Sequence, residues 1–169
     1  MNLSELLEDK RKNSSILRSN YFSLTKNKSV GIIDLKDNEI TENLLNGLKV
    51  LPSNFIIISD KNNEENIEKN IVFIKKIPKD IESGIDFIVT DNNLENLKSY
   101  LALGICPILP EDNYLSTILE EFNPVKVTGN SYIYKKENQW EIFYAIVKYL
   151  ENYKFPYDNR NLVKNLFEI

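Results

Sequence analysis

The sequence predicts an α/β domain in which helices cover both faces of a parallel sheet, and two segments carry this prediction. Residues 84–110 contain a β-rich apolar run, a stretch with apolar residues at helical spacing and a second apolar run, in direct succession. This is the strand–helix–strand order of a parallel sheet. Residues 55–58 are all apolar, as expected for a strand buried on both faces. We therefore expect five or six strands in a three-layer α/β/α, Rossmann-like arrangement.

The expected strands are short runs of apolar and β-branched residues bounded by Gly, Pro, Asn or Asp. The first five lie at residues 30–35, 55–58, 71–74, 85–89 and 107–109. Two briefer strands are expected at residues 125–127 and 132–134, on either side of Gly129. The strands thus alternate with other elements along the whole chain.

The helices are predicted from apolar residues that recur every three or four positions. A first helix at residues 2–18, with Ser4 as its N-cap, is expected to precede the sheet. Pro52 and Gly104 are expected to end the helices before them. The other helical segments are residues 39–50, 94–103, 114–122, 140–149 and 158–167, with a turn or a short helix at 78–83. Residues 60–70 are either a loop or a short exposed helix, and we favour a helix at 64–68.

Aromatic residues are concentrated near the end of the chain. They are Tyr132, Tyr134, Trp140, Phe143, Tyr144, Tyr149 and Tyr153. Helical and strand spacing assigns most of them to the core, and a platform that stacks on sugars is the alternative. In the helix at 140–149, the core-facing side is expected to carry Trp140, Phe143, Ile146, Val147 and Leu150.

The length and composition are those of an ordinary globular protein. The chain has 169 residues, of which 42% are hydrophobic, and a chain of this length buries about 70% of its unfolded surface. It contains no internal repeat, no low-complexity tract and no linker. We expect a single domain, residues 1–169, with an N-terminal helical segment at 1–28 packed against it.

Several functional classes are disfavoured by what the sequence lacks. It has no His and one cysteine, Cys106, which leaves no Cys–His zinc site, no intramolecular disulfide and no imidazole base. We expect Cys106 to be buried, and we expect no metal and no cofactor. The net charge of −4 and the pI near 5.1 disfavour nucleic acid as a partner. No segment is apolar enough for a signal core or a membrane span, so we expect a cytoplasmic protein with no membrane contact.

Five segments, in order, resemble one enzyme family. They are residues 10–17 (KRKNSSIL), 31–35 (GIIDL), 84–89 (GIDFIV), 100–108 (YLALGICPI) and 128–134 (TGNSYIY). Together they resemble the C-terminal, nucleotide-sugar-binding half of bacterial glycogen and plant starch synthases, which are GT-B glycosyltransferases. The resemblance spans nearly the whole chain and does not include the N-terminal, acceptor-binding half of those enzymes.

The residues that hold the donor in that family are mostly replaced here. The resemblance places Asp34 where the family has an arginine and Glu39 where it has a lysine, the two cations that bind the pyrophosphate. At about 5 Å and an effective dielectric near 20, each such charge interacts by roughly 3 kcal/mol. Reversing both signs is expected to disfavour a diphosphate strongly.

Two further family positions show the same trend. Asp91 keeps one carboxylate of the pair that touches the sugar and the ribose, whereas Ser99 stands at the place of the other. The Gly-Gly turn that lets backbone amides approach the donor is replaced by Glu111, Asp112 and Asn113. Glycine is needed for such an approach because it has no Cβ. The resemblance therefore predicts a donor site that is lost or repurposed, with no catalytic residue.

We accordingly expect a degenerate, non-catalytic binding or scaffolding module. Its partner is expected to be another protein or a second copy, bound through the face that the N-terminal half covers in the two-domain enzymes. One alternative is half of a split glycosyltransferase that transfers glucose from ADP- or UDP-glucose. Another is a receiver-like regulatory domain, although the chain lacks the adjacent acids and the late Lys-Pro of that family, since Val127 follows Lys126.

Two charged patterns have both an ordinary and a functional interpretation. Asp34, Asp60 and Asp91 each follow an expected strand, where capping and turn roles are the ordinary interpretation and a metal or phosphoryl-accepting cluster is the functional one. The basic run 10–12 is expected to be a solvated helix face rather than a docking site.

Overall fold

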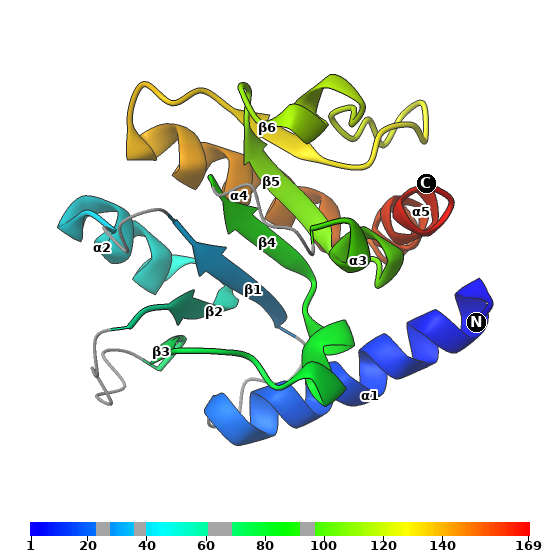
Figure 1. Cartoon of the computed structure of the whole chain (residues 1–169), viewed down its shortest axis with the longest axis horizontal. Coiled ribbons are helices and arrows are strands. Elements are labelled where there is room, and N and C mark those ends of the chain that lie inside the picture. Colours follow the sequence, from blue (N-terminus) through cyan, green and yellow to red (C-terminus); the bar gives the residue numbers. More distant parts are fainter. Residues whose placement is uncertain (23–27, 36–39, 61–68, 92–96) are drawn as a thin grey trace.

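A computed structural model describes residues 1–22, 28–35, 40–60, 69–91 and 97–169. Its sheet has six strands in the order β3-β2-β1-β4-β5-β6, and every neighbouring pair is parallel (Figure 1). The strands are β1 (Ser29–Asp34), β2 (Ser53–Ile58), β3 (Ile71–Ile74), β4 (Phe87–Thr90), β5 (Cys106–Pro110) and β6 (Tyr132–Tyr134). The predicted α/β class with a parallel sheet is confirmed.

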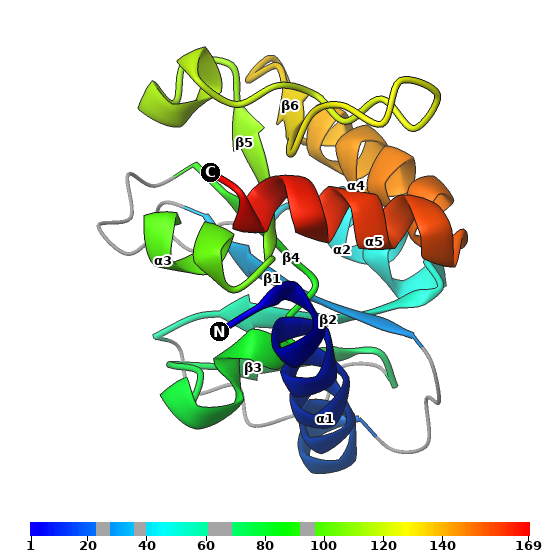
Figure 2. The ribbon, with the colours of Figure 1, turned by 90° about the vertical axis from the view of Figure 1, so that its right-hand side faces the viewer.

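Helices cover both faces of this sheet. On one face lie α2 (Glu42–Val50) and α4 (Gln139–Tyr153), and on the other lie the 3₁₀ helix η2 (Lys79–Gly84) and α3 (Leu97–Ala102). Two further helices, α1 (Leu3–Tyr21) and α5 (Pro156–Phe167), lie near the amino-terminal ends of the central strands (Figure 2). Within the described residues, no helix is both long and apolar enough to span a membrane.

Short polar side chains fix where the main helices begin. Asn2 caps α1 in a capping box with Glu5, whose backbone N–H it accepts at 3.0 Å. The predicted cap at Ser4 is wrong, because Ser4 already lies inside the helix. Thr41 caps α2 by accepting the backbone N–H of Leu44, and Asn138 caps α4 by accepting that of Trp140. Each cap satisfies a backbone donor that has no partner within its helix.

The region between β5 and β6 differs from the prediction. In place of a helix at 114–122, only the short 3₁₀ helix η3 (Tyr114–Thr117) forms. The predicted strand at 125–127 is wrong: these residues form a turn in which the side chain of Asn123 accepts the N–H groups of Val125 and Lys126. Val125 is 92% exposed. The Asn123 side chain satisfies backbone donors that a strand would have paired with its neighbour.

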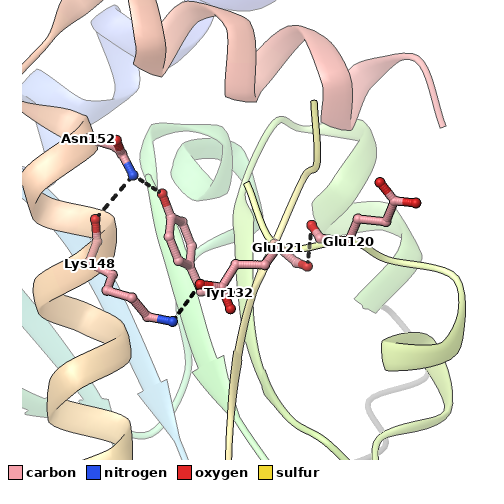
Figure 3. Close-up of polar contacts among 6 residues, drawn as sticks. Glu120, Glu121, Tyr132, Lys148 and Asn152 are labelled. Atoms are coloured by element: carbon pink, nitrogen blue, oxygen red, sulfur yellow. Dashed lines mark hydrogen bonds and ion pairs between the residues drawn. The ribbon is translucent and has the colours of Figure 1, made fainter. Parts of the chain in front are cut away.

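Aromatic side chains pack between the sheet and α4. Phe87 of β4 contacts Tyr149 of α4 with ring centroids 4.6 Å apart, and Tyr149 packs edge-on against Tyr132 of β6. The hydroxyl of Tyr132 accepts a 2.6 Å hydrogen bond from Asn152 (Figure 3). A 2.5 Å ion pair between Lys148 and Glu121 lies beside it. These contacts fix α4 against the last strand.

The predicted core face of α4 is wrong at its first residue. Trp140 is 54% exposed, and Tyr144 one turn later is 60% exposed. The buried face instead carries Ile142, Ala145, Ile146, Tyr149 and Leu150. The core assignment is confirmed for Tyr132, Tyr134 and Tyr149 and is wrong for Trp140. Phe143 and Tyr153 are partly buried against the core, and Tyr144 is exposed.

Candidate ligand site at the carboxyl ends of β1 and β4

The strand order reverses direction between β1 and β4. From β1 the chain proceeds to β2 and β3 on one side, and then crosses to β4, β5 and β6 on the other. Asp34 and Thr90, the last residues of β1 and β4, are paired across this point. In open parallel sheets, ligands bind beyond the carboxyl ends of the strands at such a switch.

A cavity of about 290 Å³ opens at this edge, and we call it the switch-point cavity. Its walls come from the ends of β1, β4 and β6 and from the start of α4. They are formed by Leu35, Asp91, Tyr134, Lys136, Asn138, Gln139 and Ile142. Polar groups thus converge on a space with two aliphatic walls, which is the usual character of a small-molecule site.

Tyr134 is the most unusual wall residue. It is only 4% exposed, and its hydroxyl has no hydrogen-bond partner among the described residues. Burial raises the pKa of Tyr134, and the nearby carboxylates of Asp91 and Asp112 raise it further. The hydroxyl therefore stays protonated and can donate to a ligand. A buried polar group without a partner costs about 1–3 kcal/mol, so such a group requires an explanation.

The charged groups around this cavity are largely acidic. Lys136 forms a 2.8 Å ion pair with the exposed Asp112. Asp91 adds a second carboxylate. Asn138 accepts the N–H of Trp140 through its side-chain oxygen, so that its NH₂ group is directed to other partners. At neutral pH, the positive charge of Lys136 is thus already paired with Asp112 before a ligand binds.

The positions taken from the family resemblance do not all converge on one cavity. Asp91 lines the switch-point cavity and Asp112 contacts it through Lys136. Asn113 is buried, and its side-chain oxygen caps η3 by accepting the N–H of Leu115. Ser99 is exposed on α3. Glu39 lies outside the described residues.

Asp34 lines a different space, which we call the lysine cavity. This cavity has a volume of about 190 Å³ and lies on the face of the sheet that carries η2 and α3. Its charged side chains are Asp34, Lys75, Lys76, Lys79 and Glu82. Three ammonium groups and two carboxylates leave it with a net positive charge, so the sign reversal at Asp34 is offset by lysines from another part of the chain.

These lysines were not singled out from the sequence. Lys75 and Lys76 directly follow β3, so their place beyond the carboxyl end of a strand is a signal that sequence reasoning can use. Asp34, Asp60 and Asp91 do not form the acidic cluster of the metal or phosphoryl-accepting interpretation. In the described ranges, no three His, Cys, Asp or Glu side chains gather to hold a metal ion.

No protein-family model matches the chain. No curated protein matches it in sequence either.

Solved structures with the same fold are GT-B glycosyltransferases. The chain matches the catalytic domain of starch synthase IV from Arabidopsis thaliana, bound to ADP and acarbose, with a TM-score of 0.76 and 14% identity. It matches sucrose-phosphate synthase from Thermosynechococcus elongatus with a TM-score of 0.64 and 10% identity. It matches the Anabaena protein HepE in complex with UDP and glucose with a TM-score of 0.64 and 12% identity.

The matches extend over 100%, 94% and 93% of this chain but over only 40%, 43% and 47% of those structures. The chain therefore has the fold of one half of a GT-B glycosyltransferase, in agreement with the resemblance to the C-terminal half.

Proposed function

We propose that this domain is a non-catalytic binding module, in which the switch-point cavity holds an uncharged, hydroxyl-rich ligand of about the size of a monosaccharide. The observation that carries the proposal is Tyr134, a wall residue of this cavity whose buried hydroxyl lacks a partner among the described residues. A hydroxyl group of the ligand would accept a hydrogen bond from the Tyr134 hydroxyl.

The charges around the cavity support an uncharged ligand over a sugar diphosphate. A diphosphate would lie near Asp91 and Asp112, and it would compete with Asp112 for Lys136. Each like-charge contact at about 5 Å costs roughly 3 kcal/mol at an effective dielectric near 20. Uncharged hydroxyl groups avoid this repulsion. They can also form hydrogen bonds with the Tyr134 hydroxyl and the Asn138 amide, while Leu35 and Ile142 would pack against the apolar face of a sugar ring.

Isothermal titration calorimetry with glucose, ADP-glucose and UDP-glucose tests this proposal. We expect glucose to bind saturably with a Kd on the order of millimolar. The substitution Tyr134→Phe should weaken that binding about tenfold, because one hydrogen bond to a buried group is lost. Tyr144→Phe is the matched control, since it makes the same change on the exposed face of α4. Binding of a sugar diphosphate well below 1 mM without glucose binding would contradict the proposal.

The second candidate function is half of a split glycosyltransferase, and the lysine cavity favours it. Its three ammonium groups can replace the family cations whose positions Asp34 and Glu39 occupy. This function predicts that ADP-glucose or UDP-glucose binds and that Lys75→Gln and Lys76→Gln together weaken binding at least tenfold. The exposed pair Lys135→Gln and Lys154→Gln serves as the charge-matched control. Equal losses in both double variants would indicate non-specific attraction and exclude this function.

We also propose that the carboxyl edge of the sheet contacts a second copy of this chain. In the two-domain enzymes that the chain resembles, this is the face next to the N-terminal half. Trp140, at the start of α4 beside the switch-point cavity, exposes apolar surface of the kind that is enriched in interfaces. Sedimentation velocity should show a concentration-dependent dimer that Trp140→Ser weakens. A monomer at all concentrations would contradict it.

A further inference from the structure

A third cavity lies at the opposite end of the sheet, near the amino-terminal ends of the strands. It has a volume of about 320 Å³ and is bounded by α1, the residue before β4, the end of α4 and the first turns of α5. Figure 2 shows α1 and α5 at this end of the molecule. The polar side chains that matter here are Lys10, Arg11, Ser14, Arg18, Asp86 and Asn159. We call this space the arginine cavity.

Lys10 is the buried cation of the arginine cavity. Its side chain is only 7% exposed, so the predicted solvated face at residues 10–12 is wrong at this position. The Nζ atom donates to the backbone carbonyls of Ile85 at 2.7 Å, Ser83 at 3.2 Å and Leu103 at 3.3 Å. These partners satisfy its three donors but carry no net charge. Dipoles therefore solvate the positive charge, and the nearby carboxylate of Asp86 stabilises it further.

The two arginines add to this charge. Arg18 donates through one Nη atom to the hydroxyl of Ser14 at 2.6 Å and to the carbonyl of Lys28 at 3.3 Å. A guanidinium has five donors in a planar fork, so donors remain for a ligand. Arg11, one turn before Ser14 on the same helical stripe, is exposed. Within the part of the chain that the structure describes, neither arginine has a carboxylate within 4 Å.

One acidic side chain, Asp86, lines the arginine cavity, and it is already hydrogen-bonded to the backbone. Its Oδ2 accepts the backbone N–H of Val30 at 2.9 Å. Burial raises the pKa of Asp86, an effect that the charge of Lys10 opposes. Three cations against one carboxylate leave an excess positive charge in a protein whose net charge is −4. Such an excess inside a cavity attracts anions and is relieved when one binds.

We propose that the arginine cavity binds a small phosphorylated molecule, with the phosphate held between Arg11 and Arg18 and the Ser14 hydroxyl donating to it. Planar guanidinium groups bind phosphate oxygens in pairs and are the preferred side chains for this purpose. The Ser14 oxygen accepts from Arg18, which directs the hydroxyl hydrogen away from Arg18. Asn159 and the apolar walls Leu7 and Val163 remain for the organic part of the ligand.

Phosphate binding in this cavity would join α1 to α5. On its other side α1 is fixed to η2, where the side chain of Asn13 donates to the hydroxyl of Ser83 at 2.8 Å. A ligand that binds only the folded chain raises stability in proportion to the logarithm of its concentration. Thermal denaturation therefore reports occupancy of the cavity directly.

The test uses the whole chain, with inorganic phosphate and glycerol 3-phosphate as probes and sodium chloride at equal ionic strength as the reference. We expect both probes to raise Tm saturably, by a few degrees at about 10 mM. Calorimetry should show that Arg11→Gln and Arg18→Gln each weaken binding about tenfold or more. If Arg18→Gln unfolds the chain, Arg11→Gln still tests the proposal, because Arg11 is exposed and its substitution should not affect folding.

The matched control is Lys12→Gln, which removes one positive charge from the neighbouring exposed position of α1. It should leave phosphate binding within about twofold of the wild type, since a solvated surface charge contributes little. Asp91→Asn, at the far end of the sheet, should have no effect, which separates this site from the switch-point cavity. No stabilisation beyond that of chloride, or an equal loss with Lys12→Gln, would overturn the proposal.

Discussion

The buried ionisable side chains at the two ends of the sheet differ in their hydrogen bonding. At the amino-terminal end, the ammonium of Lys10 donates to three backbone carbonyls, and Asp86 accepts a backbone N–H. At the carboxyl end, the hydroxyl of Tyr134 is buried with no partner among the described residues. Buried groups that are hydrogen-bonded within the chain hold its elements together, whereas a buried group without such a partner can still form a hydrogen bond with a ligand. The comparison indicates that Lys10 and Asp86 serve the fold and that Tyr134 serves a ligand.

The largest effect that tests this comparison is expected at Gly84, the last residue of η2, where α1 packs against that helix. A Cβ at Gly84 would lie 2.3 Å from the backbone of Asn13 and Ser14. Backbone cannot move aside as a side chain can, so Gly84→Val should lower the free energy of unfolding by about 3 kcal/mol or more. Urea denaturation followed by circular dichroism measures this change.

Gly47→Ala is the control for that substitution. Its added Cβ would lie 2.9 Å from the ring of Phe143, which is a side chain, and Gly47 lies inside α2. The gain in helix propensity of about 1 kcal/mol offsets part of the contact. If Gly84→Val destabilises no more than Gly47→Ala, the close docking of α1 is not important for stability.

The second effect is a pH dependence that arises from Lys10. Burial lowers the pKa of Lys10 from 10.5 to about 8. Between these two values the unfolded chain binds a proton that the folded chain has lost, so stability rises with pH. Lys10 alone contributes a rise on the order of 3 kcal/mol. Above about pH 9 the buried thiol of Cys106 and hydroxyl of Tyr153 oppose this rise, because burial raises the pKa of each and they lose their protons only in the unfolded chain.

Urea denaturation at a series of pH values from about 7.5 to 9.5 measures this rise. Lys10→Met should remove it, whatever the effect of the substitution on stability at pH 7. Lys12→Met is the control, since Lys12 is exposed on the same helix. A wild type and a Lys10→Met variant with parallel pH profiles would show that Lys10 stays charged in the folded chain.

A third, smaller effect compares two tyrosines of the same strand. Tyr132 accepts a hydrogen bond from Asn152, and Tyr134 has no partner among the described residues. Tyr132→Phe should therefore destabilise by about 1 kcal/mol, and Tyr134→Phe should be neutral or stabilising by a similar amount. Thermal denaturation of both variants without ligand measures the difference. Destabilisation of equal size in both would mean that the Tyr134 hydroxyl has a structural partner.

The smallest effect is expected at the rim of the switch-point cavity. Lys136 and Asp112 form an exposed ion pair, and such pairs contribute at most about 1 kcal/mol. Asp112→Asn should change stability by less than about 0.5 kcal/mol. It should also release Lys136, so that the affinity for ADP-glucose rises at low salt. An unchanged affinity would show that Lys136 does not face the cavity opening.

Local sequence patterns were sufficient to predict the sheet. The apolar run that became β2 and the strand–helix–strand unit around α3 were predicted because burial on both faces leaves nearly continuous apolar sequence. Pairing with distant residues was not predictable. The chain from 118 to 123 has apolar residues at helical spacing, yet Glu121 bridges Ser131 instead of forming a helix. Tertiary pairing there outweighs a weak local preference.

The candidate site was predicted only where a residue follows a strand. Asp91 was found by this rule, and Lys75 and Lys76 satisfy the same rule. Tyr134 was assigned to the core, and its missing partner is a property of the folded surroundings that no spacing reveals. Lys10 shows the same limit, since it bonds to carbonyls 75 and 93 residues further along the chain. A basic run alone does not show which member is buried.

The position of β4 between β1 and β5 has a consequence for synthesis on the ribosome. When β1, β2 and β3 have emerged, one side of β1 still lacks its neighbour, because β4 is made later. Until then the nascent chain exposes a long apolar strand with unpaired backbone groups, which is a template for aggregation. Chaperone dependence of this protein should therefore be greatest for chains stalled before residue 87 and should fall sharply once residues 87–90 are released.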